Sequence, residues 1–109
     1  MPSVSVHFDP NETTIHAGYS NFAEALVAVI EACLGAQRDK VQIMAVPLAH
    51  PPIGRTVYIE IKARANEHRT EAVLADFVQR VDALSRAELG TPCRIRYFGY
   101  PGSFLAAAN

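Results

Sequence analysis

The residue with the clearest chemical potential is Pro2, which directly follows Met1 and precedes a segment of alternating polarity. Removal of Met1 would leave the ring nitrogen of Pro2 as a free secondary amine. An α-amino group has an ordinary pKa of about 7.7–8.0, and an apolar pocket or a nearby guanidinium would lower that pKa. Such an amine can act as a general base near neutral pH, whereas a retained Met1 would convert it to a non-basic amide. A proline at this position is uninformative by itself, so its interpretation depends on the elements around it.

The first half of the chain predicts a strand, a helix and a second strand. Residues 3–8 alternate between apolar and polar side chains, as a strand does. Residues 21–36 place apolar side chains at helical spacing, with Ser20 or Asn21 as the N-cap and Gly35 at the end. Residues 40–46 again alternate, which predicts a strand after the helix.

The second half repeats this order at an offset of 53 or 54 positions. Residues 56–63 read as a strand, residues 66–89 as a helix capped by Asn66 and ended by Gly90, and residues 94–99 as the last strand. A β-α-β unit joins two parallel strands through a right-handed crossover. Two such units, about 2–46 and 56–99, predict one α+β domain over 1–109, a four-stranded sheet with two helices on one face.

The opposite face of that sheet would be uncovered. Its expected residues include Ser5, Tyr58, Glu60 and Arg96, a mixture that fits a subunit interface or a polar channel better than a dry core. Oligomerisation would also bury more surface for a chain of only 109 residues.

Composition excludes several classes of function. The net charge is −1 and the charged residues form no basic stripe, so we expect no nucleic-acid partner. We read no apolar run of about 18 residues and no signal peptide, so we expect no membrane association and a cytoplasmic location. Cys33 and Cys93 are expected to be free thiols, and the four histidines show no metal-ligand spacing. We therefore predict no cofactor and no metal.

Three features together resemble the tautomerase superfamily, which includes 4-oxalocrotonate tautomerase, 5-carboxymethyl-2-hydroxymuconate isomerase, macrophage migration inhibitory factor and cis-3-chloroacrylic acid dehalogenase. These features are Pro2 ahead of a strand, the duplicated β-α-β pattern and the sequence Asn66-Glu67-His68-Arg69-Thr70. Family members have an amino-terminal proline and often a Gly-Arg-Ser turn that opens the helix, where this chain has His68-Arg69-Thr70. The resemblance covers nearly the whole chain. We expect a homotrimer, because the pattern is duplicated and the uncovered sheet face is too polar for a core.

The resemblance also implies roles for four further residues. Arg69, expected in the first turn of the second helix, would bind a substrate carboxylate or polarise its carbonyl oxygen, as a guanidinium fork is suited to do. Arg94 matches a substrate-binding arginine lent across a subunit boundary, and Arg96 could serve instead; the alternative for both is an interface ion pair with Glu60. Tyr97 matches a proton-donating tyrosine, although a core or interface aromatic is the alternative.

The predicted function is keto-enol tautomerisation of a small carboxylate-bearing enol or keto acid. Pro2, Arg69 and Tyr97 would be catalytic, and Arg94 and Arg96 would bind substrate. The alternatives are a non-catalytic trimeric protein that binds a small molecule, or a decarboxylase or dehalogenase of the same superfamily. The dehalogenase pattern is incomplete, because Asn66 replaces a second arginine, Cys33 replaces a histidine, and residues 100–109 contain no acid.

Overall fold

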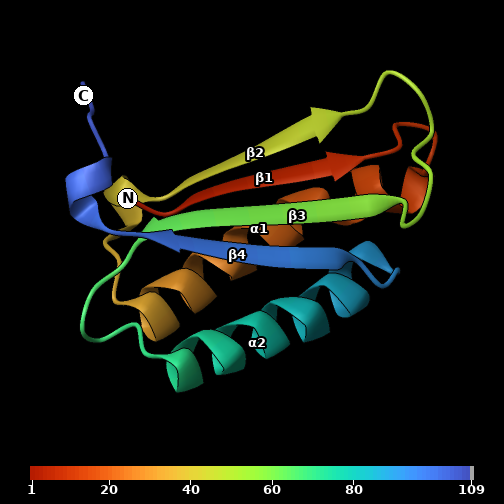
Figure 1. Cartoon of the computed structure of the whole chain (residues 1–109). Helices are drawn as coiled ribbons and strands as arrows, with labels where there is room; N and C mark the ends of the chain where they lie inside the picture. The colour runs from red at the N-terminus through yellow and green to blue at the C-terminus, as the bar shows by residue number, and fades with distance from the viewer. Residues whose placement is uncertain (109) are drawn as a thin grey trace.

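In the computed structural model, which describes residues 1–108, four strands and two long helices form two layers (Figure 1). The elements follow in the order β1 (Ser3–Phe8), α1 (Thr13–Leu34), β2 (Gln42–Pro47), β3 (Val57–Arg64), α2 (Glu71–Leu89) and β4 (Arg94–Tyr100). Short 3-10 turns, η1 (Arg38–Lys40) and η2 (Gly102–Phe104), precede β2 and follow β4.

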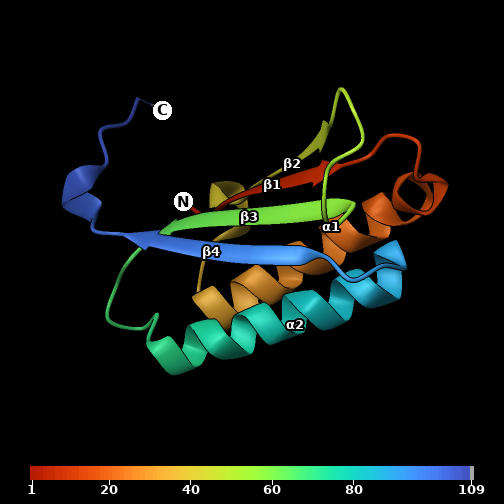
Figure 2. The same cartoon turned by 45° about the vertical axis from the view of Figure 1, so that its right-hand side comes forward.

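The sheet is mixed, with the strand order β2-β1-β3-β4. The outer pairs, β1 with β2 and β3 with β4, are parallel, and the central pair of β1 with β3 is antiparallel. Each β-α-β unit therefore contributes one half of the sheet, and the start of β1 lies beside the end of β3, with Ser3 opposite Lys62. The two chain termini lie at this same end of the sheet (Figures 1 and 2).

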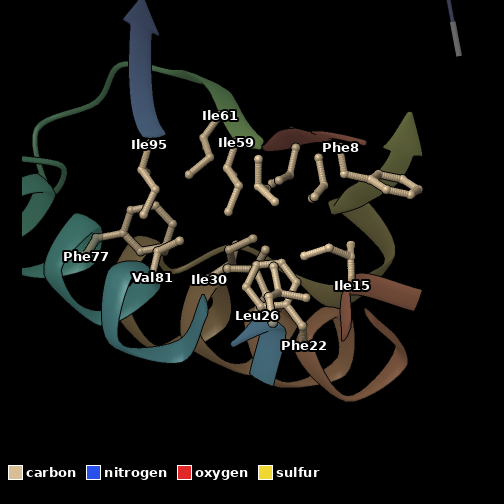
Figure 3. Close-up of a cluster of buried hydrophobic side chains, with 14 of the residues drawn as sticks. Phe8, Ile15, Phe22, Leu26, Ile30, Ile59, Ile61, Phe77, Val81 and Ile95 are labelled. Carbon is tan, nitrogen blue, oxygen red and sulfur yellow. The ribbon is translucent and has the colours of Figure 1, made fainter. Parts of the chain in front are cut away.

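Both helices cover one face of the sheet and leave the other uncovered, as the sequence predicts (Figure 2). Alternate residues of β1 and β3 are buried against the helices, and helical residues at spacings of three or four meet them, which gives one continuous core (Figure 3). The largest fully buried side chains are Phe22, Phe77, Ile15, Leu26, Ile30, Ile59, Ile61, Leu89, Val4, Val6, Val57 and Val81.

The two helices touch at Gly18 of α1. A Cβ atom placed on Gly18 would lie 1.8 Å from the carbonyl oxygen of Glu88 in α2, so only a residue without a side chain fits. This contact fixes how closely the amino-terminal part of α1 approaches the end of α2.

Helix α1 begins at Thr13, well before the predicted start at residue 21. Ile15 is buried and extends the apolar stripe by nearly two turns, and Ser20 and Asn21 are ordinary exposed helical residues rather than caps. By length and composition this extended helix could cross a membrane, contrary to the expectation that no apolar run is long enough. Its buried residues, however, form one stripe that packs in the core. That arrangement is typical of an amphipathic helix that packs on one face of a sheet.

Helix α2 begins at Glu71 rather than near Asn66, and its N-cap is Thr70, whose side chain accepts a hydrogen bond from the backbone N–H of Val73 at 3.3 Å. Asn66 instead organises the turn before the helix. Its Oδ1 accepts hydrogen bonds from the backbone N–H groups of His68 and Arg69. Arg69 therefore lies in the connection ahead of the helix, which corrects its predicted place in the first turn.

Candidate functional site

Pro2 is buried at the point where β1 begins. Its carbonyl oxygen accepts a hydrogen bond from the backbone N–H of Gln42 at 3.1 Å, which continues the pairing of β1 with β2 by one residue. The strand pairing thus holds Pro2 in place from its carbonyl side. In the structure its nitrogen is joined to Met1, whose side chain is half-exposed.

Three cations act on the amine at this end of the chain. Burial lowers the pKa of the Met1 amine below its ordinary value of 8.0, and Arg64, Arg69 and Lys40 lower it further. Arg64 is the last residue of β3, and Lys40 is the last residue of η1, just before β2. Each is carried here by a strand end or a turn, and each disfavours a protonated amine beside it.

A cavity of about 480 Å³ opens beside this amine. Its lining combines the start of β1, two cations and the carboxyl-terminal segment, and comprises Met1, Ser3, Lys40, Arg64, Tyr100, Leu105 and Ala107. Among residues 1–108, the lining holds no acidic side chain. A Cβ atom on Gly102 would lie 3.0 Å from Cδ of Arg64, so η2 packs closely on the stem of this arginine. The cavity is therefore suited to a small anion.

Arg69 does not line this cavity. Its Nε–H donates to the carbonyl oxygen of Leu34 at 3.2 Å, and its NH1 group donates to the carbonyl oxygen of Arg64 at 2.6 Å. The guanidinium thus joins the carboxyl-terminal end of α1 to the end of β3. Cations at the end of a helix complement its dipole and satisfy carbonyl groups that have no helical partner. These contacts make Arg69 a tether between two elements.

Tyr97 lies on the helix-covered side of β4, like Ile95, and its ring packs edge-on against Phe77 of α2 with centroids 6.0 Å apart. Within residues 1–108 its buried hydroxyl group has no hydrogen-bond partner. Burial raises the pKa of Tyr97, and the nearby positive charge of Arg69 opposes that rise. The structure therefore places the Tyr97 ring in the core position that was the alternative to a catalytic one.

Arg94 and Arg96 lie on the uncovered face, level with Tyr58 and Glu60 of β3. The level of Ser3 on β3 is Lys62, four residues from Tyr58, so about 13 Å of strand separates Ser3 from the level of Arg94. Within a single chain, these two arginines are therefore too far from Pro2 to share a site with it. Nor does Glu60 form an ion pair with them among the described residues; its carboxylate contacts Lys62 and accepts from the Tyr58 hydroxyl.

The sequence matches no protein-family profile and no curated protein. Its structure, however, is similar over nearly its full length to solved structures of tautomerase-superfamily proteins. A member of the cis-3-chloroacrylic acid dehalogenase family matches with a TM-score of 0.76 at 16% identity, over 96% of this chain and 79% of that one. A fused 4-oxalocrotonate tautomerase, described as a wild-type symmetric trimer, matches with a TM-score of 0.75 at 17% identity, over 98% and 92% of the chains.

A macrophage migration inhibitory factor-like protein from Entamoeba histolytica matches with a TM-score of 0.70 at 11% identity, over 98% of this chain and 95% of that one. The chain has the tautomerase fold. The predicted fold, a four-stranded sheet with two helices on one face built from duplicated β-α-β units, is confirmed. Because the sequence identities are low, the structural similarity shows the fold alone. The chemistry of the site has to be inferred from the residues of this chain.

Two residues that line the cavity beside Met1, Lys40 and Arg64, were not among the predicted site residues. Lys40 begins one predicted strand and Arg64 directly follows another, which was the available signal. Neither position shows its proximity to Pro2 until β1 is known to pair antiparallel with β3 and parallel with β2.

Proposed function

We propose that this chain is a keto-enol tautomerase whose base is the free amine of Pro2, exposed when Met1 is removed. The observation that supports the proposal most is the buried position of Pro2 at the start of β1, between Met1 and Ser3, which line a cavity together with Lys40 and Arg64. The Met1 amine at this end of the chain has its pKa lowered by burial and by three cations, and we expect the same of a Pro2 amine one residue further on. A useful fraction is then unprotonated at neutral pH.

In the proposed reaction, a small enol or keto acid enters the cavity with its carboxylate against Arg64 and Lys40. The Pro2 nitrogen takes a proton from the enol oxygen or from the carbon beside the carbonyl group. The two cations stabilise the enolate, and the protonated amine returns the proton to the other atom of the pair. This assignment moves the carboxylate contact from Arg69, whose guanidinium is bound to two backbone carbonyls, to Arg64. The reaction needs no cofactor.

A homotrimer is the assembly we propose. The uncovered sheet face exposes Met44 and Phe98 beside polar residues, and the Nδ1 atom of His7 is buried there without a partner within the described part of the chain. A fused tautomerase of the same fold is described as a symmetric trimer. The prediction that a neighbouring subunit lends Arg94 to the site stays a prediction. Light scattering at micromolar concentration tests the assembly, and a monomer would contradict it.

The second candidate function is binding without catalysis. A Pro2 nitrogen that is still joined to Met1 is an amide, and an amide cannot act as the base. If the protein retains Met1, the same cavity can still hold a carboxylate against Lys40 and Arg64.

One set of measurements separates the two candidates. Exact intact mass shows whether Met1 is removed, and turnover of phenylenolpyruvate reports proton transfer. We expect the processed protein to ketonise phenylenolpyruvate and a variant with Gly-Ser placed ahead of Pro2 to lose nearly all turnover while it keeps the same circular dichroism spectrum. Equal turnover by the two proteins would show that the Pro2 amine is not the base. 2-Hydroxymuconate provides a second substrate for the same comparison.

A further inference from the structure

A second cavity, of about 510 Å³, lies at the opposite end of the uncovered sheet face from Pro2. Its lining comprises Pro52, Ile53, Gly54, Arg55, Tyr58 and Arg94. It contains two guanidinium groups, one phenol and a fully exposed isoleucine, but no acidic side chain. The lining therefore joins positive charge to apolar surface.

This second cavity is related to the first by the internal duplication of the chain. In the first cavity, Met1 precedes the first strand of its unit and Lys40 precedes the second strand. In the second cavity, Arg55 precedes β3 and Arg94 begins β4. The covering segments also correspond: residues 101–108 follow β4 over the first cavity, and residues 48–55 follow β2 over the second. The same two-unit architecture thus builds two similar hollows.

The two hollows differ at the position that matters for chemistry. The first cavity lies beside the start of the chain, which carries an amine. At the second cavity the chain continues as a peptide through Arg55 and Thr56 into β3. A peptide nitrogen has no basic lone pair, so the second hollow has cations but no base. It can bind a carboxylate ligand, but it offers no amine that could take a proton from that ligand.

The arginines of the second cavity are available for a ligand. Within residues 1–108, neither Arg55 nor Arg94 forms an ion pair or donates a side-chain hydrogen bond. The nearest acid along the sheet, Glu60, is engaged by the Tyr58 hydroxyl and by Lys62. A bidentate carboxylate matches the planar donor fork of a guanidinium, and the exposed Ile53 and the ring of Tyr58 suit an apolar body attached to it.

From these observations we propose that the cavity formed by Arg55, Arg94, Tyr58 and Ile53 is a second, non-catalytic site for a small carboxylate with an apolar group. The proposal goes beyond the tautomerase activity and assigns Arg94 to this cavity of its own chain, as the alternative to the predicted loan of Arg94 to a neighbouring subunit's reaction site. Each chain would bind two such carboxylates, one beside the amine and one beside Arg55.

The test uses phenylpyruvate as the probe and the full chain with Gly-Ser ahead of Pro2, in which the amine is blocked. In NMR titrations we expect saturable shifts of the backbone amides of Gly54, Arg55, Tyr58 and Arg94. Methyl phenylpyruvate, which lacks the carboxylate, should produce none of these shifts. Arg55→Gln should weaken the binding at least tenfold, and Arg80→Gln, a matched change on the exposed surface of α2, should leave it unchanged.

Turnover distinguishes this site from the reaction site. In the processed protein, kcat/KM for phenylenolpyruvate should be the same in Arg55→Gln as in the unmodified chain. The proposal is overturned if the four amides show no saturable shift, if the shifts survive Arg55→Gln, or if Arg55→Gln lowers kcat/KM, since the cavity would then serve the reaction itself. A failure of Pro2 catalysis would leave the titration with the blocked protein unaffected.

Discussion

Arg69 binds the backbone carbonyl oxygen of Arg64 at 2.6 Å and so holds the strand end from which the Arg64 side chain reaches the cavity beside Pro2. The same guanidinium binds the carbonyl oxygen of Leu34 at 3.2 Å. Two arginines that both influence the amine therefore act by different routes. Arg64 lines the cavity directly, and Arg69 positions the backbone that carries Arg64.

The first prediction separates these two roles. Arg69→Gln should lower the free energy of unfolding by roughly 1–3 kcal/mol, because two charge-assisted hydrogen bonds to carbonyl groups are lost. Arg64→Gln should leave stability within about 0.5 kcal/mol, because its side chain is exposed and unpaired in residues 1–108, but should raise KM for phenylenolpyruvate. Urea denaturation and steady-state kinetics on both variants measure the difference. The assignment is wrong if Arg69→Gln raises KM while stability stays unchanged.

The second prediction concerns the pH dependence of kcat/KM. The free amine is the active form, so kcat/KM should rise with pH and level off above the pKa of the Pro2 amine. We expect that pKa to lie below its ordinary value, because burial and nearby cations lower the pKa of the Met1 amine at the same end of the chain. Arg64 is the first of the three cations that lower the pKa of the Met1 amine, and its loss should favour protonation of a Pro2 amine in the same place. Arg64→Gln should therefore move the midpoint of the profile to higher pH, in addition to any uniform loss of binding. Arg80→Gln, the control, should leave the midpoint in place, and a midpoint that stays fixed in Arg64→Gln would remove Arg64 from the environment of the base.

Much of the fold could be predicted because its signals are local. The sequence shows the alternation along the strands and the glycines that end both helices, Gly35 and Gly90. In the structure both glycines have left-handed backbone conformations. The start of α1 was missed because Ile15 is the single buried residue in its first two turns. The start of α2 was missed because Asn66 and Thr70 are both good cap residues, and only the structure shows that Thr70 caps the helix.

The site was less predictable because its parts meet through strand pairing. The position of Pro2 at the start of a strand is a local property, and it was predicted. The approach of Lys40 and Arg64 to Pro2 depends on which strands are neighbours, and alternation does not encode that choice. For Tyr97 the sequence left a catalytic and a core or interface role open, and its packing against Phe77 appears only in the structure.

The third prediction tests the contact between the helices at Gly18. Replacement of an exposed helical glycine by alanine ordinarily stabilises a helix by about 0.5–1 kcal/mol. Here the new Cβ would overlap the Glu88 carbonyl oxygen, so the helices must separate. We expect Gly18→Ala to destabilise the protein by roughly 1–3 kcal/mol, as overpacking does. Ser20→Ala, at an exposed position of the same helix, should stay within about 0.5 kcal/mol in the same denaturation experiment, and a stabilised Gly18→Ala would show that the contact is looser than the structure indicates.

The fourth prediction decides the role of Tyr97. Its hydroxyl group is buried without a partner within residues 1–108, and a buried polar group without a hydrogen bond costs about 1–3 kcal/mol. Tyr97→Phe removes that group and keeps the ring against Phe77, so the free energy of unfolding should stay the same or rise. The family resemblance implies instead a proton donor, and loss of a donor would lower kcat by about 10²–10⁴-fold. Because the ring lies on the helix-covered side of β4, we expect kcat for phenylenolpyruvate to change less than about threefold.

Phe77→Leu provides the matched control, since it removes the ring contact and should destabilise the core while the hydroxyl group remains. A stable Tyr97→Phe variant with a hundredfold lower kcat would restore Tyr97 to the catalytic set and would mean that its hydroxyl group finds its partner in the substrate.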